Sequence, residues 1–149
     1  MAYLTHRPIA VERLVAEVSD PACGGVVTFV GVVRNHHEGR RVTRLEYSAY
    51  EPMAEREMEA VARAVGRRHK GVRLAMRHRL GALKIGDVAV AIAAASAHRS
   101  EAFDACQKAI DLVKTRVPVW KKEYGPKGMY WIEGTHCVPS RHGRGRKNS

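Results

Sequence analysis

The stretch from Ser96 to Glu123, SAHRSEAFDACQKAIDLVKTRVPVWKKE, limits the possible folds of this chain more than any other segment. Ser96 or Ser100 is placed to cap the start of a helix, and Pro118 ends it by about Arg116. Between these ends, apolar residues recur at the spacing of one helix face, namely Phe103, Cys106, Ile110 and Val113, widened by Ala105, Ala109 and Leu112. The segment therefore predicts a long, half-buried helix with cationic residues at both ends.

Strands and helices alternate unevenly along the rest of the chain, which predicts an α+β fold with a mixed or antiparallel sheet and about three helices. Helical spacing predicts helices at Pro8 to Ser19 and at Pro52 to His69. Apolar or alternating runs predict strands at 26–33, 41–50, 72–80, 88–96, 117–124 and 128–134.

Three of these strands carry more specific expectations. The run 26–33 is expected to be well buried, with Gly31 at a bulge or close backbone approach, and to form a hairpin with the run 41–50. The run 88–96, VAVAIAAAS, is small and apolar on both faces, which predicts a central strand. His78 stands on the apolar face of the run 72–80 and is expected to be a hydrogen-bonded core histidine.

The length of 149 residues predicts one domain, assigned to 1–137, followed by a basic tail at 138–149 with the composition of a disordered end. The formal net charge is +11. The tail from Gly134 contributes four arginines and lysines and no acid, so the body carries +7. A basic body favours an acidic or phosphorylated partner, although scattered surface charge explains much of it.

No apolar run approaches the ~20 residues of a membrane span, and the first residues lack the layout of a signal peptide, so a cytoplasmic protein is expected. Neither a metal nor another cofactor is expected. Cys23, Cys106 and Cys137 lie far apart, and no histidine clusters with cysteines or carboxylates at ligand spacing.

Several cations could serve a site, and each also has a purely structural interpretation. His98 and Arg99 precede a predicted helix start, where anions bind, but they could be an exposed charged pair. Lys114 in the last helical turn could cap the helix, or could have a lowered pKa if other cations crowd it. Arg34 and Lys121 end or flank predicted strands, where surface arginines and lysines are common.

Five ordered blocks together resemble the large, catalytic subunit of molybdopterin synthase. They are FVGVVRNHHEG, LEYSAYEPMAE, HRLGALKIGD, SAHRSEAF and LVKTRVPVWKKE, and the likeness covers about Pro8 to Glu133. The resemblance implies an α+β fold with a hammerhead-like β arrangement and a sulfurtransferase of molybdenum cofactor biosynthesis. It implies that cyclic pyranopterin monophosphate, or precursor Z, receives two sulfurs from the thiocarboxylated Gly-Gly end of a small ubiquitin-like subunit. It also implies a heterotetramer, in which a homodimer of large subunits carries one small subunit at each end.

The resemblance also implies roles for particular residues. Lys114 and Lys121 match the two functional lysines of the family, with Lys114 favoured as the reactive one because it sits at the more enclosed helix end. Substrate-binding positions are matched by Arg34, His98, Arg99, Lys121, Lys122 and Glu123. Many members have a lysine where this chain has Val32, so that contact is not expected here.

The length of the predicted helix separates the two ends of the segment from Ser96 to Glu123. His98 and Lys114 are 16 positions apart, which is roughly 24 Å along one helix at 1.5 Å per residue. One small substrate cannot touch both ends. We therefore expect a pocket shared across a homodimer, with Arg34, Lys114 and Lys121 from one chain and His98 and Arg99 from the other.

Two other functions remain open at this point. The net charge of +11 and the arginine-rich tail allow a nucleic-acid-binding module, although no nucleic-acid-binding motif is present. The chain could also be a non-catalytic subunit that keeps the fold and binds a carrier protein.

Overall fold

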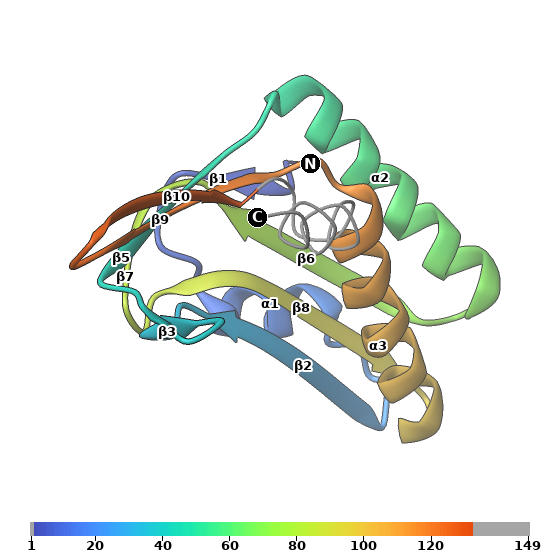
Figure 1. Ribbon diagram of the computed structural model, residues 1–149. Coiled ribbons are helices and arrows are strands. Elements are labelled where there is room, and N and C mark those ends of the chain that lie inside the picture. Colours follow the sequence, from blue (N-terminus) through green and yellow to red (C-terminus); the bar gives the residue numbers. More distant parts are fainter. Residues whose placement is uncertain (1, 133–149) are drawn as a thin grey trace.

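The computed structural model describes residues 2–132, which form two four-stranded sheets, a two-stranded ribbon and three helices (Figure 1). The predicted tail at 138–149 and Cys137 lie outside the described residues. In chain order the elements are β1 Leu4–Thr5, α1 Val11–Val18, β2 Gly25–Val32, β3 His36–His37, β4 Arg40–Arg41, β5 Arg44–Ser48, α2 Glu51–Arg68, β6 Arg73–Arg79, β7 Gly81–Lys84, β8 Val88–Ser96, α3 Arg99–Arg116, β9 Trp120–Gly125 and β10 Gly128–Ile132.

The first sheet has the strand order β1-β6-β8-β2, with β8 near its centre. Alternate residues of β8 face opposite sides, and both sides are covered. Its alanines, Ala91, Ala93 and Ala95, pack with Leu14 and Val18 of α1, since small side chains let that helix approach closely. Val90 and Ile92 face the other side, where α2 and α3 build the main core (Figure 1). The prediction of a central strand at 88–96 is confirmed.

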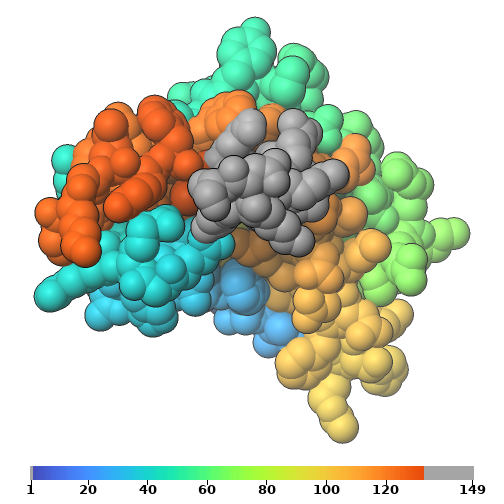
Figure 2. Space-filling model, in the orientation of Figure 1, coloured from blue at the N-terminus to red at the C-terminus, as the bar shows by residue number. Residues whose placement is uncertain are grey.

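The second sheet has the order β10-β9-β5-β7, and all of its pairs are antiparallel. It continues from the C-terminal end of α3 through β9, so it adjoins the cationic end of that helix. The ribbon β3–β4 leaves the end of β2 and lies against the β9–β10 hairpin. Figure 2 shows the cyan atoms of the ribbon in contact with the orange atoms of this hairpin. Mixed pairing in the first sheet and antiparallel pairing in the second confirm the predicted α+β class.

The predicted hairpin between the runs 26–33 and 41–50 is wrong. β5 pairs with β7 and β9 in the second sheet, and β2 pairs with β8 in the first. Neighbouring strands in sequence were expected to pair, but the ribbon between them carries the chain from one sheet to the other. β1 and β7 were not predicted, because two and four residues are too short for a pattern.

β2 is also less buried than expected, because it is an edge strand. Val26, Val30 and Val32 are 42%, 37% and 54% exposed. Val26 and Val30 lie on the same face of the sheet as α1, opposite Ala95 and Ala91, and α1 leaves them uncovered at this edge. Its predicted irregularity at Gly31 is confirmed: the register shifts between Gly31 and Val32, and a Cβ at Gly31 would lie 2.7 Å from Val90 Cγ1.

The helices follow the predictions closely, with differences at their starts. α1 begins at Val11, after Pro8 rather than at it. Neither predicted serine caps α3: His98 is its N-cap residue without a side-chain bond, and Ser96 Oγ donates instead to the carbonyl of His98. Phe103 was expected on the buried face of α3, but it is 58% exposed.

The prediction of a hydrogen-bonded core histidine in β6 is confirmed. His78 is 5% exposed, and its Nδ1 lies 3.0 Å from the carbonyl oxygen of Arg79.

Candidate active site

Three of the predicted cations gather where α3 ends. Lys114 lies in the last turn of α3, Lys121 follows in β9, and Arg34 comes directly after β2. Pro118 brings these elements together, because it cannot continue the helix and turns the chain into an extended strand. The sequence could not show this crowding of Lys114; the tertiary structure creates it.

The crowding changes the acidity of Lys114. Part of its side chain is exposed, yet partial burial of the ammonium group lowers the pKa of Lys114, and the charges of Lys121 and Arg34 lower it further. Burial and like charges both disfavour the protonated amine. Lys114 therefore has a larger neutral fraction near physiological pH than an ordinary lysine, which suits a group that moves a proton or acts as a nucleophile.

Glu123 is the negative centre of the site. Its carboxylate is only 3% exposed, and Lys121 Nζ lies 3.3 Å from Oε2. Burial by itself would raise the pKa of Glu123, but the hydrogen bond from His37 and the charge of Lys121 outweigh it and hold that pKa below its ordinary value. Glu123 is therefore ionised at neutral pH, and it anchors Lys121 beside Lys114.

Two residues of the β3–β4 ribbon complete the contacts of Glu123. His37 Nδ1 lies 3.0 Å from Oε1 and 2.9 Å from Oε2, and Arg40 Nη2 donates to Oε1 over 3.1 Å. Arg40 also stacks on Tyr130, 4.2 Å from the ring centroid. Sequence reasoning did not select His37 or Arg40, because more than eighty residues separate each from Glu123. The sequence offers one signal for them, namely their place in the polar segment that directly follows Arg34.

Tyr47 and His78 pack against each other next to these charges. Tyr47 pairs with Lys121 across β5 and β9, and its ring meets His78 edge-on with centroids 5.1 Å apart. Burial, reinforced by the charge of Glu123, raises the pKa of Tyr47 to about 12. Burial lowers the pKa of His78 to about 4, and Lys114 adds to that effect. Both side chains are neutral at physiological pH, so they add no charge to the site.

The structure does not bring every predicted site residue to this cluster. Lys122 lies on the opposite face of β9 from Lys121, where its Nζ is 4.9 Å from the centroid of the Trp131 ring. His98 and Arg99 are exposed at the far end of α3, which runs unbroken from Arg99 to Arg116. Within one chain, His98 and Lys114 therefore do not share a cleft.

Neither thiol nor metal chemistry is indicated in the described residues. Cys106 is buried against the core, and burial raises the pKa of its thiol, which makes it a poor nucleophile. Between residues 2 and 132, no group of three or more His, Cys, Asp or Glu side chains is arranged to hold a metal ion.

Comparison with known proteins decides the family. A profile described as MoaE protein matches residues 4–116. The molybdopterin synthase catalytic subunit 1 of Mycobacterium tuberculosis is 47% identical over 129 residues, which cover 87% of this chain and 88% of that protein. The chain belongs to the MoaE family. The predicted family, and with it the prediction of an enzyme, is confirmed.

Solved MoaE-family structures agree with the fold. Molybdopterin synthase from Staphylococcus aureus matches with a TM-score of 0.84 at 36% identity, covering 88% of this chain and 96% of that one. A complex of subunits 1 and 2 of the molybdopterin-converting factor from Helicobacter pylori contains the same fold, with a TM-score of 0.66 at 22% identity and coverage of 89% and 85%.

These matches do not support the alternative of a nucleic-acid-binding module. Among the helices of this MoaE-family chain that the structure describes, none is long and apolar enough to cross a membrane.

Proposed function

We propose that this chain is the catalytic subunit of a cytoplasmic molybdopterin synthase. It takes sulfur from the thiocarboxylated Gly-Gly end of a small ubiquitin-like subunit and inserts two sulfurs into cyclic pyranopterin monophosphate. The observation that carries the proposal is the crowding of Lys114 by Lys121 and Arg34, beside the buried carboxylate of Glu123. A site of this kind can hold an anionic substrate and still offer an amine with a lowered pKa.

The chemistry needs both properties. Each transfer forms a carbon–sulfur bond at a substrate carbon, which loses an oxygen substituent, and breaks the carbon–sulfur bond of the carrier, whose end leaves as a carboxylate once water supplies an oxygen. Anionic groups are present at the start and at the end, so Lys121 and Arg34 stabilise charge. Lys114, with its lowered pKa, moves the proton that the attacking water loses. Lys122 faces away from this cluster, and the proposed pocket does not include it.

His98 and Arg99 enter the same pocket from a second copy of the chain. The support for this step is the placement of β2, whose outer edge has no strand partner within residues 2–132. Gly25, where β2 starts, lies next to Arg99: a Cβ on Gly25 would be 3.4 Å from Arg99 Cα. The other end of β2 leads directly to Arg34. The strand thus connects the two halves of the predicted site.

A two-fold axis through the middle of this edge would exchange those ends. Eight residues of β2 span about 26 Å at ~3.3 Å per residue, close to the roughly 24 Å between His98 and Lys114 along α3. If two copies pair β2 with β2 in antiparallel fashion, the start of one strand meets the end of the other. His98 and Arg99 of one copy then lie beside Arg34 of its partner. The exposed valines of β2 become covered in the same interface.

A small partner subunit is supported by the family and by the fold. The H. pylori structure that shares this fold is a complex of two different subunits. In the proposed assembly, two copies of this chain form the centre and one small subunit binds each outer end, where the exposed edge strand β10 and the Glu123 cluster lie.

Reconstitution tests the proposal. The chain is mixed with a thiocarboxylated small subunit and precursor Z, and dithiolene formation is measured. Lys114→Ala and Lys121→Ala are each expected to lower the rate by about 100-fold or more, the usual contribution of a proton-transfer group for Lys114 and of a charge-stabilising group for Lys121. Lys70→Ala removes the same charge from an exposed position after α2 and should leave the rate unchanged. Undiminished product with both site variants would reject the assignment. A wild type that binds the carrier without forming product would instead identify a non-catalytic subunit.

A further inference from the structure

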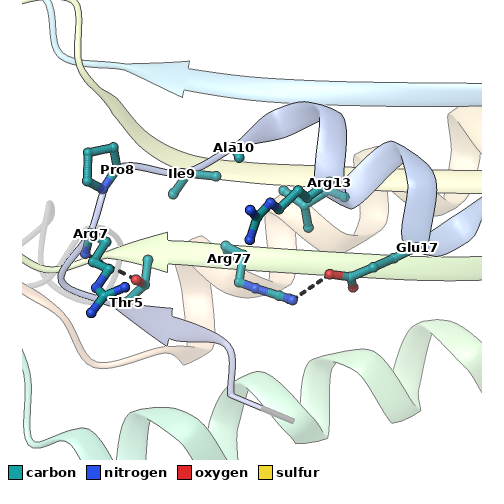
Figure 3. A pocket seen from close by; sticks show the side chains of 9 residues that line it. Thr5, Arg7, Pro8, Ile9, Ala10, Arg13, Glu17 and Arg77 are labelled. Carbon is teal, nitrogen blue, oxygen red and sulfur yellow. Dashed lines mark hydrogen bonds and ion pairs between the residues drawn. The ribbon is translucent and has the colours of Figure 1, made fainter.

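A cavity of about 270 Å³ lies on the other side of the first sheet from α3, where the segment after β1 meets α1 and β6 (Figure 3). None of the predicted site residues lines it. Arg7 of the connecting segment, Arg13 of α1 and Arg77 of β6 all contribute to its wall. Figure 3 shows Arg13 and Arg77 together on one side of the space and Arg7 on the other.

The charge of this cavity is not balanced. Among the described residues of its wall Glu17 is the one acid, so three guanidinium groups and one carboxylate leave a formal charge of +2. Glu17 is already engaged, because its Oε1 lies 2.6 Å from Arg77 Nη2. Arg77 also donates to the carbonyl of Met76. The guanidinium groups of Arg7 and Arg13 have neither an ion pair nor a hydrogen bond within residues 2–132.

The remaining wall is apolar. Pro8, Ile9 and Leu14 line the cavity between the arginines. The start of α1 adds to the positive field, since its N-cap residue, Ala10, offers no side chain to bond the open N–H groups of the first turn. Such a cavity suits a ligand with a charged end and a small apolar body.

We propose that this cavity binds a small organic phosphate, with the phosphate held between Arg7 and Arg13 and the apolar part against Pro8 and Ile9. A phosphate dianion matches the net charge of +2, and guanidinium groups bind phosphate oxygens in pairs. The volume is slightly below the range of about 300–1,000 Å³ typical of ligand pockets, so the ligand is a monophosphate of few atoms. This site is independent of the proposed sulfur transfer.

Calorimetric titration of the full chain with phenyl phosphate at low ionic strength tests the site. Arg13→Gln should weaken binding about tenfold or more, because it removes a charge-assisted hydrogen bond. Arg63→Gln is the matched control: it removes the same charge from α2, where Arg63 faces Glu59 across 3.6 Å, and binding should not change. Glu17→Gln should strengthen binding, because it removes the carboxylate from the cavity wall and releases Arg77.

A second set of variants separates this cavity from the proposed active site. Binding of phenyl phosphate should persist in Lys114→Ala, and amide resonances of Ala10 and Arg13 should shift on titration in an NMR experiment. Benzoate, with a single charge, should bind more weakly than phenyl phosphate. Equal effects of Arg13→Gln and Arg63→Gln, loss of binding in Lys114→Ala, or no binding by a folded wild type would each overturn the proposal. Thermal melting of every variant confirms that the chain remains folded.

Discussion

Among the residues of the proposed site, Glu123 contacts side chains from two separate elements. Its buried carboxylate contacts His37, Arg40 and Lys121, which come from the ribbon and from β9. The negative charge of Glu123 holds each of these side chains in position, because each is a cation or donates a hydrogen bond to the carboxylate. Glu123 therefore both orders the ribbon against the second sheet and sets the position of Lys121.

Glu123→Gln is expected to lower both stability and activity. The amide keeps the shape of the side chain but leaves Lys121 and Arg40 without their counter-charge. Because those two side chains are partly solvated, we expect a loss of about 1–3 kcal/mol in the free energy of unfolding, together with slower sulfur transfer. Urea denaturation and reconstituted dithiolene formation measure the two effects. Glu38→Gln, an exposed change in the same ribbon, should affect neither; an equal effect of both variants would contradict this role.

His78 should make stability depend on pH. Burial lowers its folded pKa from 6.5 to about 4, so the unfolded chain takes up a proton first as the pH falls. Its contribution to stability is complete above pH 6.5 and is lost progressively toward pH 4, by about 3 kcal/mol. The free energy of unfolding of wild type and His78→Asn, measured across this range, should converge as the pH drops. Parallel curves would show that His78 does not titrate in this way.

Among the elements, β2 and the residue before it pack against the start of α3. Gly24 and Gly25 pack directly against the backbone that leads into the helix. A Cβ on Gly24 would lie 2.7 Å from the carbonyl oxygen of Ala97, a distance at which one of the two backbones must shift. The positions of His98 and Arg99 therefore depend on two glycines that lie far from them in sequence.

Two glycine substitutions should act in opposite directions. Gly24→Ala is expected to cost about 1–3 kcal/mol through the forced shift, and to slow sulfur transfer because His98 and Arg99 move with it. Gly66→Ala lies within α2 with no atom within 4 Å of the new Cβ, and should stabilise the chain by about 0.5–1 kcal/mol. Thermal and urea unfolding measure both. A neutral Gly24→Ala would mean that the start of α3 tolerates displacement.

For the whole molecule, the proposed assembly forms its pocket between two copies of the chain. Lys114 and His98 lie at opposite ends of an unbroken helix, so under this proposal each pocket needs residues from both copies. The two-fold pairing of β2 edges makes a specific prediction about mixtures of inactive variants.

Lys114→Ala and His98→Ala should complement each other when they are refolded together. A mixed dimer has one pocket with an intact Lys114 and an intact His98, and one pocket that lacks both. Random assembly makes half of the dimers mixed, so about a quarter of the wild-type activity should return. Lys114→Ala refolded with Lys121→Ala is the control, since both lesions belong to the same half and neither pocket is repaired. Absence of recovery in the first mixture would place each site within a single chain.

Much of the fold could be predicted because its elements have regular patterns. α2, α3 and β6 each repeat apolar residues over enough positions to show the period of a helix or a strand, and β8 is a continuous apolar run. The predicted β2–β5 hairpin failed because strand pairing depends on which edges meet after folding, and adjacency in sequence was a poor guide. Exposure of β2 was missed for a related reason: an apolar run has the same letters at an edge as at the centre of a sheet.

The order of residues alone identifies the family, the long helix α3 and the cations available at the two ends of that helix. The helix follows from the local periodicity of apolar residues. The family and the cations follow from residue identities, which can be read directly along the chain. Folding brings Lys114, Lys121 and Arg34 together and leaves Lys122 on the other face of β9. It also places His37 and Arg40 against Glu123. Desolvation and charge–charge interactions act through space, so the lowered pKa of Lys114 arises only after packing has brought distant segments together.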